Sequence, residues 1–85
     1  MRTVWKFSLR LVDGWQVVDI PLDAIPVRFG MQGDSPQLWA MVDTDKPSEP
    51  RRFAVVGTGH RIPDGGEHVG TCDHGVFVWH LFEHI

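Results

Sequence analysis

Hydrophobic and polar residues alternate along most of this chain with the period of two that a half-buried β-strand requires. The alternation is strictest from Thr3 to Leu11, and it returns between Ile25 and Met31. Pro26 interrupts the second of these segments, and because proline cannot donate to a ladder it confines that strand to a sheet edge or a strand start. The pattern as a whole predicts seven strands, at residues 3–11, 15–20, 25–31, 37–42, 52–56, 69–72 and 76–82.

Glycine and proline clusters separate these segments. Asp13-Gly14 predicts a tight hairpin that joins the first two strands, because glycine accepts the positive φ of such turns. The segment from Asp43 to Pro50 predicts a solvated loop. No window has a helical period. The sequence therefore predicts an all-β fold, a small antiparallel sandwich or partly open barrel of six to seven strands.

Two of the predicted strands, residues 37–42 and 76–82, are apolar on both faces. Such strands are typical of positions that are covered on both sides, so both should be central. A chain of 85 residues can scarcely supply two covering layers. We therefore expect a homo-oligomer that assembles through residues 76–82, with a closed monomeric sandwich as the competing interpretation.

Composition narrows the class of protein further. A length of 85 residues indicates one domain, spanning residues 1–85. The formal net charge is only −3 and the basic residues are scattered, and this distribution argues against a nucleic-acid partner. Cys72 is the only cysteine, so no intramolecular disulfide can form and a reducing cytoplasm is favoured. No apolar run approaches the ~20 residues of a membrane helix, and no secretory signal is recognisable. We expect a cytoplasmic protein without a membrane partner.

The strongest candidate for a ligand site is the segment Gly57-Thr58-Gly59-His60-Arg61. Two glycines after a strand allow successive N–H groups to converge on an anion, and the Thr58 hydroxyl, His60 and Arg61 would complete the site. The spacing matches neither of the common nucleotide-binding loops. The simpler interpretation is a strand exit that needs a positive φ and makes only local hydrogen bonds.

Metal binding and catalysis have weaker support. His60, His68, Cys72 and His74 lack the paired spacing of structural zinc sites, so we expect no metal and no cofactor. A nucleophilic Cys72 would need a nearby base and a lowered pKa, and nothing in the sequence fixes a base beside it. We therefore expect a protein that is not an enzyme.

A candidate protein interface consists of apolar residues and one histidine that lie in the predicted strands at residues 15–20 and 76–82. Trp15 follows the Asp13-Gly14 turn and is expected to be the most exposed tryptophan, either as a stray side chain or as an anchor for a partner. The remaining tryptophans are expected to build the core. His80 is either a buried histidine with one hydrogen-bond partner or a pH-sensitive interface contact. The interface residues that we predict are Trp15, Val76, Val78, His80 and Phe82.

Several blocks of the sequence occur in a recognisable order. They are Val4-Trp5-Lys6-Phe7, Leu38-Trp39-Ala40-Met41-Val42-Asp43, Gly57-Thr58-Gly59-His60, Val69-Gly70-Thr71 and Val78-Trp79-His80-Leu81-Phe82-Glu83. In this combination the chain resembles a family of short proteins of unknown function that are encoded by phages and prophages. The resemblance covers nearly the whole chain, and it implies an accessory phage protein acting in a bacterial cytoplasm.

Because phage genes of this kind often encode proteins that disable a host component, the resemblance implies a bacterial host protein as partner, in counter-defence or regulation. The alternative is a sponge that captures a nucleotide or another anionic metabolite at the Gly57–Arg61 loop.

Overall fold

The computed structural model describes residues 1–85 and contains seven β-strands and no helix. The predicted all-β class is therefore confirmed. No helix is present that is long and apolar enough to cross a bilayer. The strands are β1 (Arg2–Ser8), β2 (Gln16–Pro21), β3 (Ile25–Gln32), β4 (Ser35–Asp43), β5 (Ser48–Gly57), β6 (Gly66–His74) and β7 (Phe77–His84).

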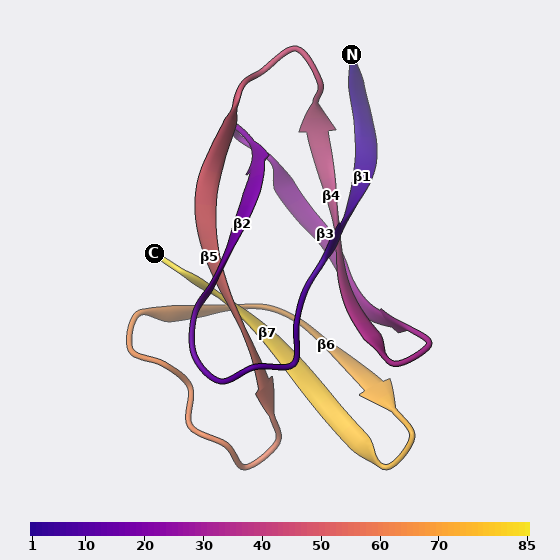
Figure 1. Cartoon of the computed structure of the whole chain (residues 1–85), viewed down its shortest axis with the longest axis vertical. Coiled ribbons are helices and arrows are strands. Elements are labelled where there is room, and N and C mark those ends of the chain that lie inside the picture. The colour runs from indigo at the N-terminus through magenta and orange to yellow at the C-terminus, as the bar shows by residue number, and fades with distance from the viewer.

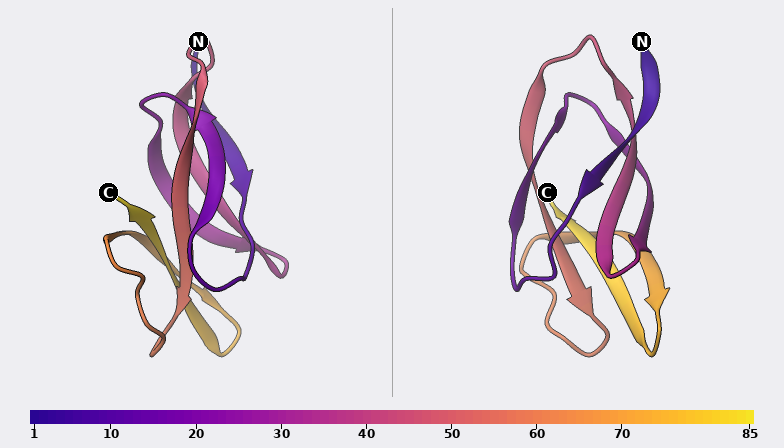
Figure 2. Two further views of the ribbon diagram at one scale, coloured as in Figure 1. Left: turned by 60° about the vertical axis from the view of Figure 1, so that its left-hand side comes forward. Right: turned by 45° about the vertical axis from the view of Figure 1, so that its right-hand side comes forward.

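The strands form two antiparallel sheets that pack face to face. One sheet has three strands in the order β1-β4-β3, and the other has four in the order β2-β5-β7-β6. The sheets do not close into a barrel, so the sandwich is the correct one of the two predicted architectures. Figures 1 and 2 show that the four-stranded sheet runs the length of the molecule, whereas the three-stranded sheet covers only part of it. We call the part of β5, β6 and β7 that extends beyond this cover the open end.

The prediction that β1 and β2 form a hairpin is wrong. β1 pairs with β4 and β2 pairs with β5, so the connection crosses from one sheet to the other. Leu9 is buried in the core, and the side chain of Gln16 bonds both the N–H and the carbonyl of Arg10, at 2.8 Å each. These contacts hold a wide loop in which Gly14 still has a positive φ of 76°.

The predicted solvated loop at residues 43–50 is shorter than expected. β4 ends at Asp43 and β5 already begins at Ser48, where it pairs with Pro21 of β2. Pro50 lies inside β5, opposite Asp19. The acidic and proline residues of this segment therefore form a tight turn and the first residues of the longest strand.

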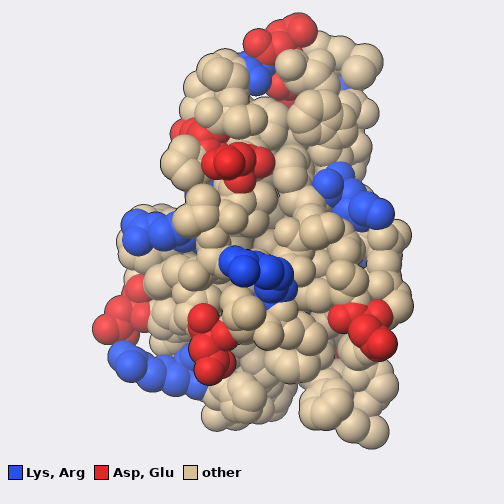
Figure 3. Space-filling view, in the orientation of Figure 1, with Lys and Arg blue, Asp and Glu red and all other residues tan.

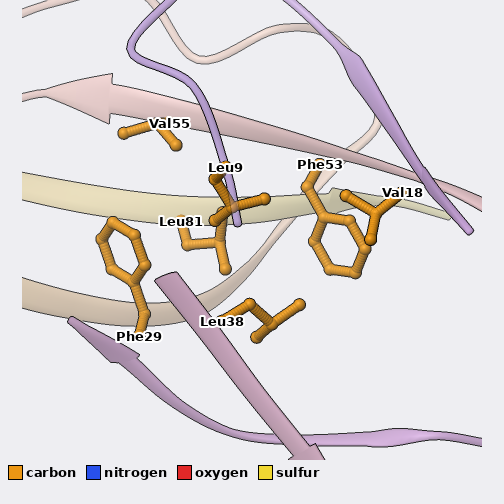
Figure 4. Close-up of a cluster of buried hydrophobic side chains, with 7 residues drawn as sticks. All are labelled: Leu9, Val18, Phe29, Leu38, Phe53, Val55 and Leu81. Carbon is orange, nitrogen blue, oxygen red and sulfur yellow. The ribbon is translucent and has the colours of Figure 1, made fainter. Parts of the chain in front are cut away.

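The main hydrophobic core lies between the two sheets. Figure 4 shows the side chains of this cluster, which come from both sheets and from the β1–β2 connection. Burial of large apolar side chains such as these is the dominant stabilising contribution to a domain of this size. The cluster consists of Leu9, Val18, Phe29, Leu38, Phe53, Val55 and Leu81.

The two sheets also approach closely where β6 faces β3. A β-bulge shifts the register of β6 between His68 and Gly70. A Cβ atom placed on Gly70 would lie only 3.2 Å from the Cβ of Phe29, which is buried. Glycine at position 70 therefore allows the closest contact between the sheets on this side of the molecule.

β7 is central in its sheet, as expected, but it is not covered on both faces. Leu81 and Phe82 are buried, at 0% and 9% exposure, whereas Phe77 is 60% exposed and Val76, in the preceding turn, is 92% exposed. The first half of β7 belongs to the open end. In the second half Leu81 lies under the three-stranded sheet, and Phe82, on the opposite face, belongs to a cluster against which Trp15 packs. The expectation that Trp5 is a core residue is also wrong, because it lies on an edge strand and is 43% exposed.

One ion pair joins two neighbouring strands of the four-stranded sheet. Arg51 on β5 bonds both carboxylate oxygens of Glu83 on β7, with Nη2 at 2.7 Å from Oε1. The Nη1 atom of the same guanidinium donates to the carbonyl of Ala24, in the β2–β3 connection, at 2.6 Å. The hydrogen bond to Glu83 raises the pKa of Arg51, so the guanidinium stays charged. One side chain thus fixes two strands and a connection relative to one another.

Candidate functional site

The predicted ligand loop and most of the predicted interface residues lie together at the open end. β5 ends at Gly57, and the following turn closes with the amide of His60 donating to the carbonyl of Gly57 at 3.0 Å. The amide of Thr58 donates to the carbonyl of Val78 on β7 at 3.2 Å. Gly59 has a φ of 87°, which explains the need for glycine at that position.

The same contacts reduce what this loop offers to an anion. Two of its amides, those of Thr58 and His60, already have acceptors within the protein. The guanidinium of Arg61 pairs with Asp64 at 3.2 Å, and both side chains are strongly exposed. The loop therefore has the geometry of a strand exit with local hydrogen bonds. The amides of Gly59 and Arg61 and the side chain of His60 are the donors left for a ligand.

A continuous chain of hydrogen bonds crosses the outer face of the four-stranded sheet. His68 Nε2 lies 2.9 Å from Thr71 Oγ1, and Thr71 Oγ1 lies 2.9 Å from His80 Nδ1. The other ring nitrogen of His80, Nε2, lies 2.8 Å from Thr58 Oγ1. The hydroxyl of Thr58 in turn donates to the carbonyl of Val78 at 3.3 Å. We call these four side chains the histidine–threonine chain.

The direction of this chain follows from its last bond. Because Thr58 donates to the carbonyl of Val78, its oxygen must accept from Nε2–H of His80. The Nδ1 atom of a neutral His80 then accepts from the hydroxyl of Thr71, whose oxygen accepts from Nε2–H of His68. Every donor has one acceptor. The hydrogen bonds can run in the opposite direction when both hydroxyls rotate and both imidazoles change tautomer, and Thr58 then donates to His80 in place of Val78.

Two open hollows lie on either side of the His60 ring. The first has a volume of about 230 Å³ and is lined by Val56, Ile62, His80 and Phe82 together with the loop. The second, of about 250 Å³, is lined by Val76, Phe77, Val78 and Trp79 together with Thr58 and His60. Because side chains alternate along β7, His80 in the first hollow and Trp79 in the second point to opposite faces of the sheet.

Trp15 lies elsewhere and is not the exposed tryptophan that we expected. It is half-buried, packs against the cluster of Ala54, Val56 and Phe82, and meets His84 edge to face with ring centroids 5.2 Å apart. Trp15 therefore covers part of the outer face of the four-stranded sheet. Its packing leaves the role of exposed aromatic at the open end to Phe77.

Cys72 has the properties of a structural thiol. It is half-buried against the core, and burial first, followed by the charge of Asp73, raises the pKa of the thiol above its ordinary value. The neighbouring His74 bonds Asp34 in the β3–β4 turn at 2.9 Å. No group of three or more His, Cys, Asp or Glu side chains lies close enough together to hold a metal ion.

Sequence reasoning missed His68 and Thr71 as partners of His80. The strict alternation of a strand would place residues three apart on opposite faces. The bulge in β6 adds one residue and returns both side chains to the outer face. Gly70 between them was the available signal, because an isolated glycine in a strand often marks a bulge.

Comparison with known proteins assigns the chain to a family. A family model described as a domain of unknown function, DUF7352, matches residues 1–85, and the chain belongs to this family. The match agrees with the expected membership of a family of unknown function. No curated protein and no solved structure matches the chain.

Proposed function

We propose that this protein is a non-enzymatic binding domain that holds a protein partner at its open end. The observation that supports the proposal is the gathering of exposed apolar side chains at the open end, outside the cover of the second sheet. Val76, Phe77 and Ile62 are 92%, 60% and 46% exposed. Apolar groups that gather in this way on a soluble domain are typical of interaction surfaces.

The chemistry of the surface favours a protein over a small anion. Protein interfaces combine an apolar centre with a polar border that has few charges. At the open end, Phe77 packs against Trp79 with ring centroids 5.9 Å apart, and the polar side chains in the same hollow are those of Thr58 and His60. Arg61, the cation that an anion site would need, is paired with Asp64. Figure 3 shows that the Lys and Arg side chains on one face of the molecule are separated from one another and form no continuous basic patch.

A non-enzymatic role agrees with the state of the reactive side chains. The raised pKa of the Cys72 thiol keeps it protonated and therefore a poor nucleophile. The hydroxyl of Thr58 donates to a carbonyl and not to a base. The resemblance to phage proteins suggests that the partner is a bacterial host protein, in counter-defence or regulation. A second copy of this chain is the other partner that the open end would suit.

Affinity capture from bacterial lysates, with the binding constant of the captured protein then measured by calorimetry, tests this proposal. Val76→Asp combined with Phe77→Ala should weaken binding at least tenfold, since truncating a central aromatic residue typically costs more than 1 kcal/mol. Val17→Asp is a matched control, because Val17 is 62% exposed on β2 and lies away from the open end. The control should bind as the wild type does.

Unchanged affinity of the double variant, with the fold shown intact by circular dichroism, would contradict the proposal. Sedimentation of the wild type over a range of concentrations separates self-association from binding to a host protein. A thermal-shift screen with mono-, di- and cyclic nucleotides tests the alternative sponge. A rise in melting temperature that Gly59→Ala and His60→Ala abolish would favour anion binding instead.

A further inference from the structure

The edge of β1 presents a row of backbone groups that no other strand uses. β1 is hydrogen-bonded to β4 alone. The amide of Leu9 donates to the carbonyl of Pro36 in this ladder, so the odd-numbered residues of β1 face β4. In an antiparallel ladder the direction alternates, and the N–H and C=O groups of the even-numbered residues therefore point outward. These residues are Arg2, Val4, Lys6 and Ser8.

The other three edge strands are less suitable for pairing. β3 and β6 each contain a bulge, and Phe29 of β3 lies in close contact with β6 at Gly70. β2 turns only Val17, Asp19 and Pro21 outward, and proline has no N–H. Bulges and prolines are means by which proteins protect sheet edges. β1 has neither.

The side chains of β1 differ in character on its two faces. On the outer face Arg2 and Lys6 are exposed, and neither forms an ion pair. Lys6 donates instead to the neutral amide oxygen of Gln32 at 2.7 Å. Asp43, opposite Arg2 in the ladder, accepts from the N-terminal ammonium at 3.3 Å. On the inner face, Trp5 is 43% exposed although it points toward the sandwich.

We propose that the β1 edge binds an extended acidic peptide as an additional strand. Carboxylates at alternate positions of this peptide lie beside Arg2 and Lys6, and the intervening apolar side chains cover Trp5. Main-chain hydrogen bonds supply affinity in this mode of recognition, and alternate side chains supply specificity. This site is separate from the open end, so it does not depend on the proposed function.

Charge decides between this occupant and a second copy of the chain. Antiparallel pairing of two β1 strands about a twofold axis would place the Arg2 and Lys6 side chains of both copies on one face. Like charges brought together across neighbouring strands are destabilising. An acidic strand forms opposite-charge pairs with the same two residues, and it is therefore the complementary partner.

Fluorescence anisotropy with a labelled, end-capped peptide Glu-Val-Glu-Phe-Glu-Val-Glu tests the proposal on the full chain. We expect saturable binding that weakens with added salt, and at least tenfold weaker binding of the matched peptide with Lys at every Glu position. Lys6→Glu should reverse this preference. The variant Val17→Glu, which introduces a carboxylate on β2, should preserve it.

N-methylation separates strand addition from simple charge attraction. Methyl groups on the amides of the Glu residues, which face β1 in the required register, should abolish binding. Methyl groups on the Val and Phe amides, which face away, should preserve it. Equal effects of the two methylation patterns, binding of the Lys peptide as tight as that of the Glu peptide, or dimerisation through β1 in sedimentation would each overturn the proposal.

Discussion

Polar groups are used in two different ways in this small sandwich, and the ion pair of Arg51 and Glu83 contrasts with the histidine–threonine chain. The ion pair is charged, bidentate and partly buried, with side-chain exposures of 18% and 21%. The histidine–threonine chain lies on the outer face of the four-stranded sheet and contains two hydroxyls that can rotate. The first arrangement has one stable geometry, whereas the second has two. The fixed contact maintains the fold, and the adjustable one lies at the surface that we assign to binding.

The largest effect should come from breaking the fixed contact. Glu83→Gln leaves the guanidinium of Arg51 partly buried without its counter-charge, and we expect a loss of about 1–3 kcal/mol in the free energy of unfolding. Urea denaturation followed by tryptophan fluorescence measures it. Glu67→Gln is the matched control, since Glu67 lies opposite Glu83 in the ladder but is exposed and unpaired. If both variants unfold at the same urea concentration, the ion pair contributes nothing to stability.

A smaller effect is expected from Thr71→Val, which removes the hydroxyl in the middle of the histidine–threonine chain. Stability should fall by only about 0.5–1 kcal/mol, because the lost bonds are exposed to water. The more specific readout is the tautomer of His80, measured by nitrogen chemical shifts. Wild type should hold the proton on Nε2, and the variant should gain the Nδ1–H form. Thr3→Val, at a threonine without a side-chain hydrogen bond, should leave the tautomer unchanged.

The smallest effect belongs to an exposed ion pair and depends on pH. A hydrogen bond from Lys46, at 2.6 Å, lowers the pKa of Asp23 below its usual 3.8. Folding is therefore favoured by this contact above the ordinary pKa of Asp, and the contribution disappears as the pH falls through the lowered value. Asp23→Asn should lower the melting temperature slightly at pH 6 and not at pH 2. High salt should reduce the difference, because both groups are exposed. Asp19→Asn provides an unpaired comparison, and an identical pH profile for both variants would contradict the assignment.

The sequence predicted the strands better than it predicted their partners. Alternation, apolar runs and the turns between them located all seven strands, because each of these signals is a local property of its segment. The hairpin predicted at Asp13-Gly14 does not form, although Gly14 has the expected positive φ. The reason is that the pairing of β1 with β4 depends on core contacts between residues far apart in the sequence. The prediction that β7 is buried on both faces was wrong for a similar reason. The extent of the opposite sheet and the packing of Trp15 on the outer face determine which half of that strand is covered.

The candidate site was predicted in part. Sequence patterns indicated both the loop at residues 57–61 and the residues of β7, and the structure brings these two groups together. The patterns did not indicate that the loop amides would be used internally, because hydrogen-bond partners come from neighbouring strands. Trp15 was misjudged because its packing partners, among them His84, are nearly seventy positions away. In each case the missing information was a contact between distant segments.

The crossing of the β1–β2 connection between the sheets also determines how the chain can be divided. A cut in the turn at residues 44–47 would yield one fragment with the whole three-stranded sheet and β2, and another with β5, β6 and β7. Neither piece is self-sufficient, because β2 would lack the strand to which it is hydrogen-bonded and β5 would lose an edge neighbour. The protein therefore has the layout of a split reporter, and we expect the two fragments to fold only when they associate.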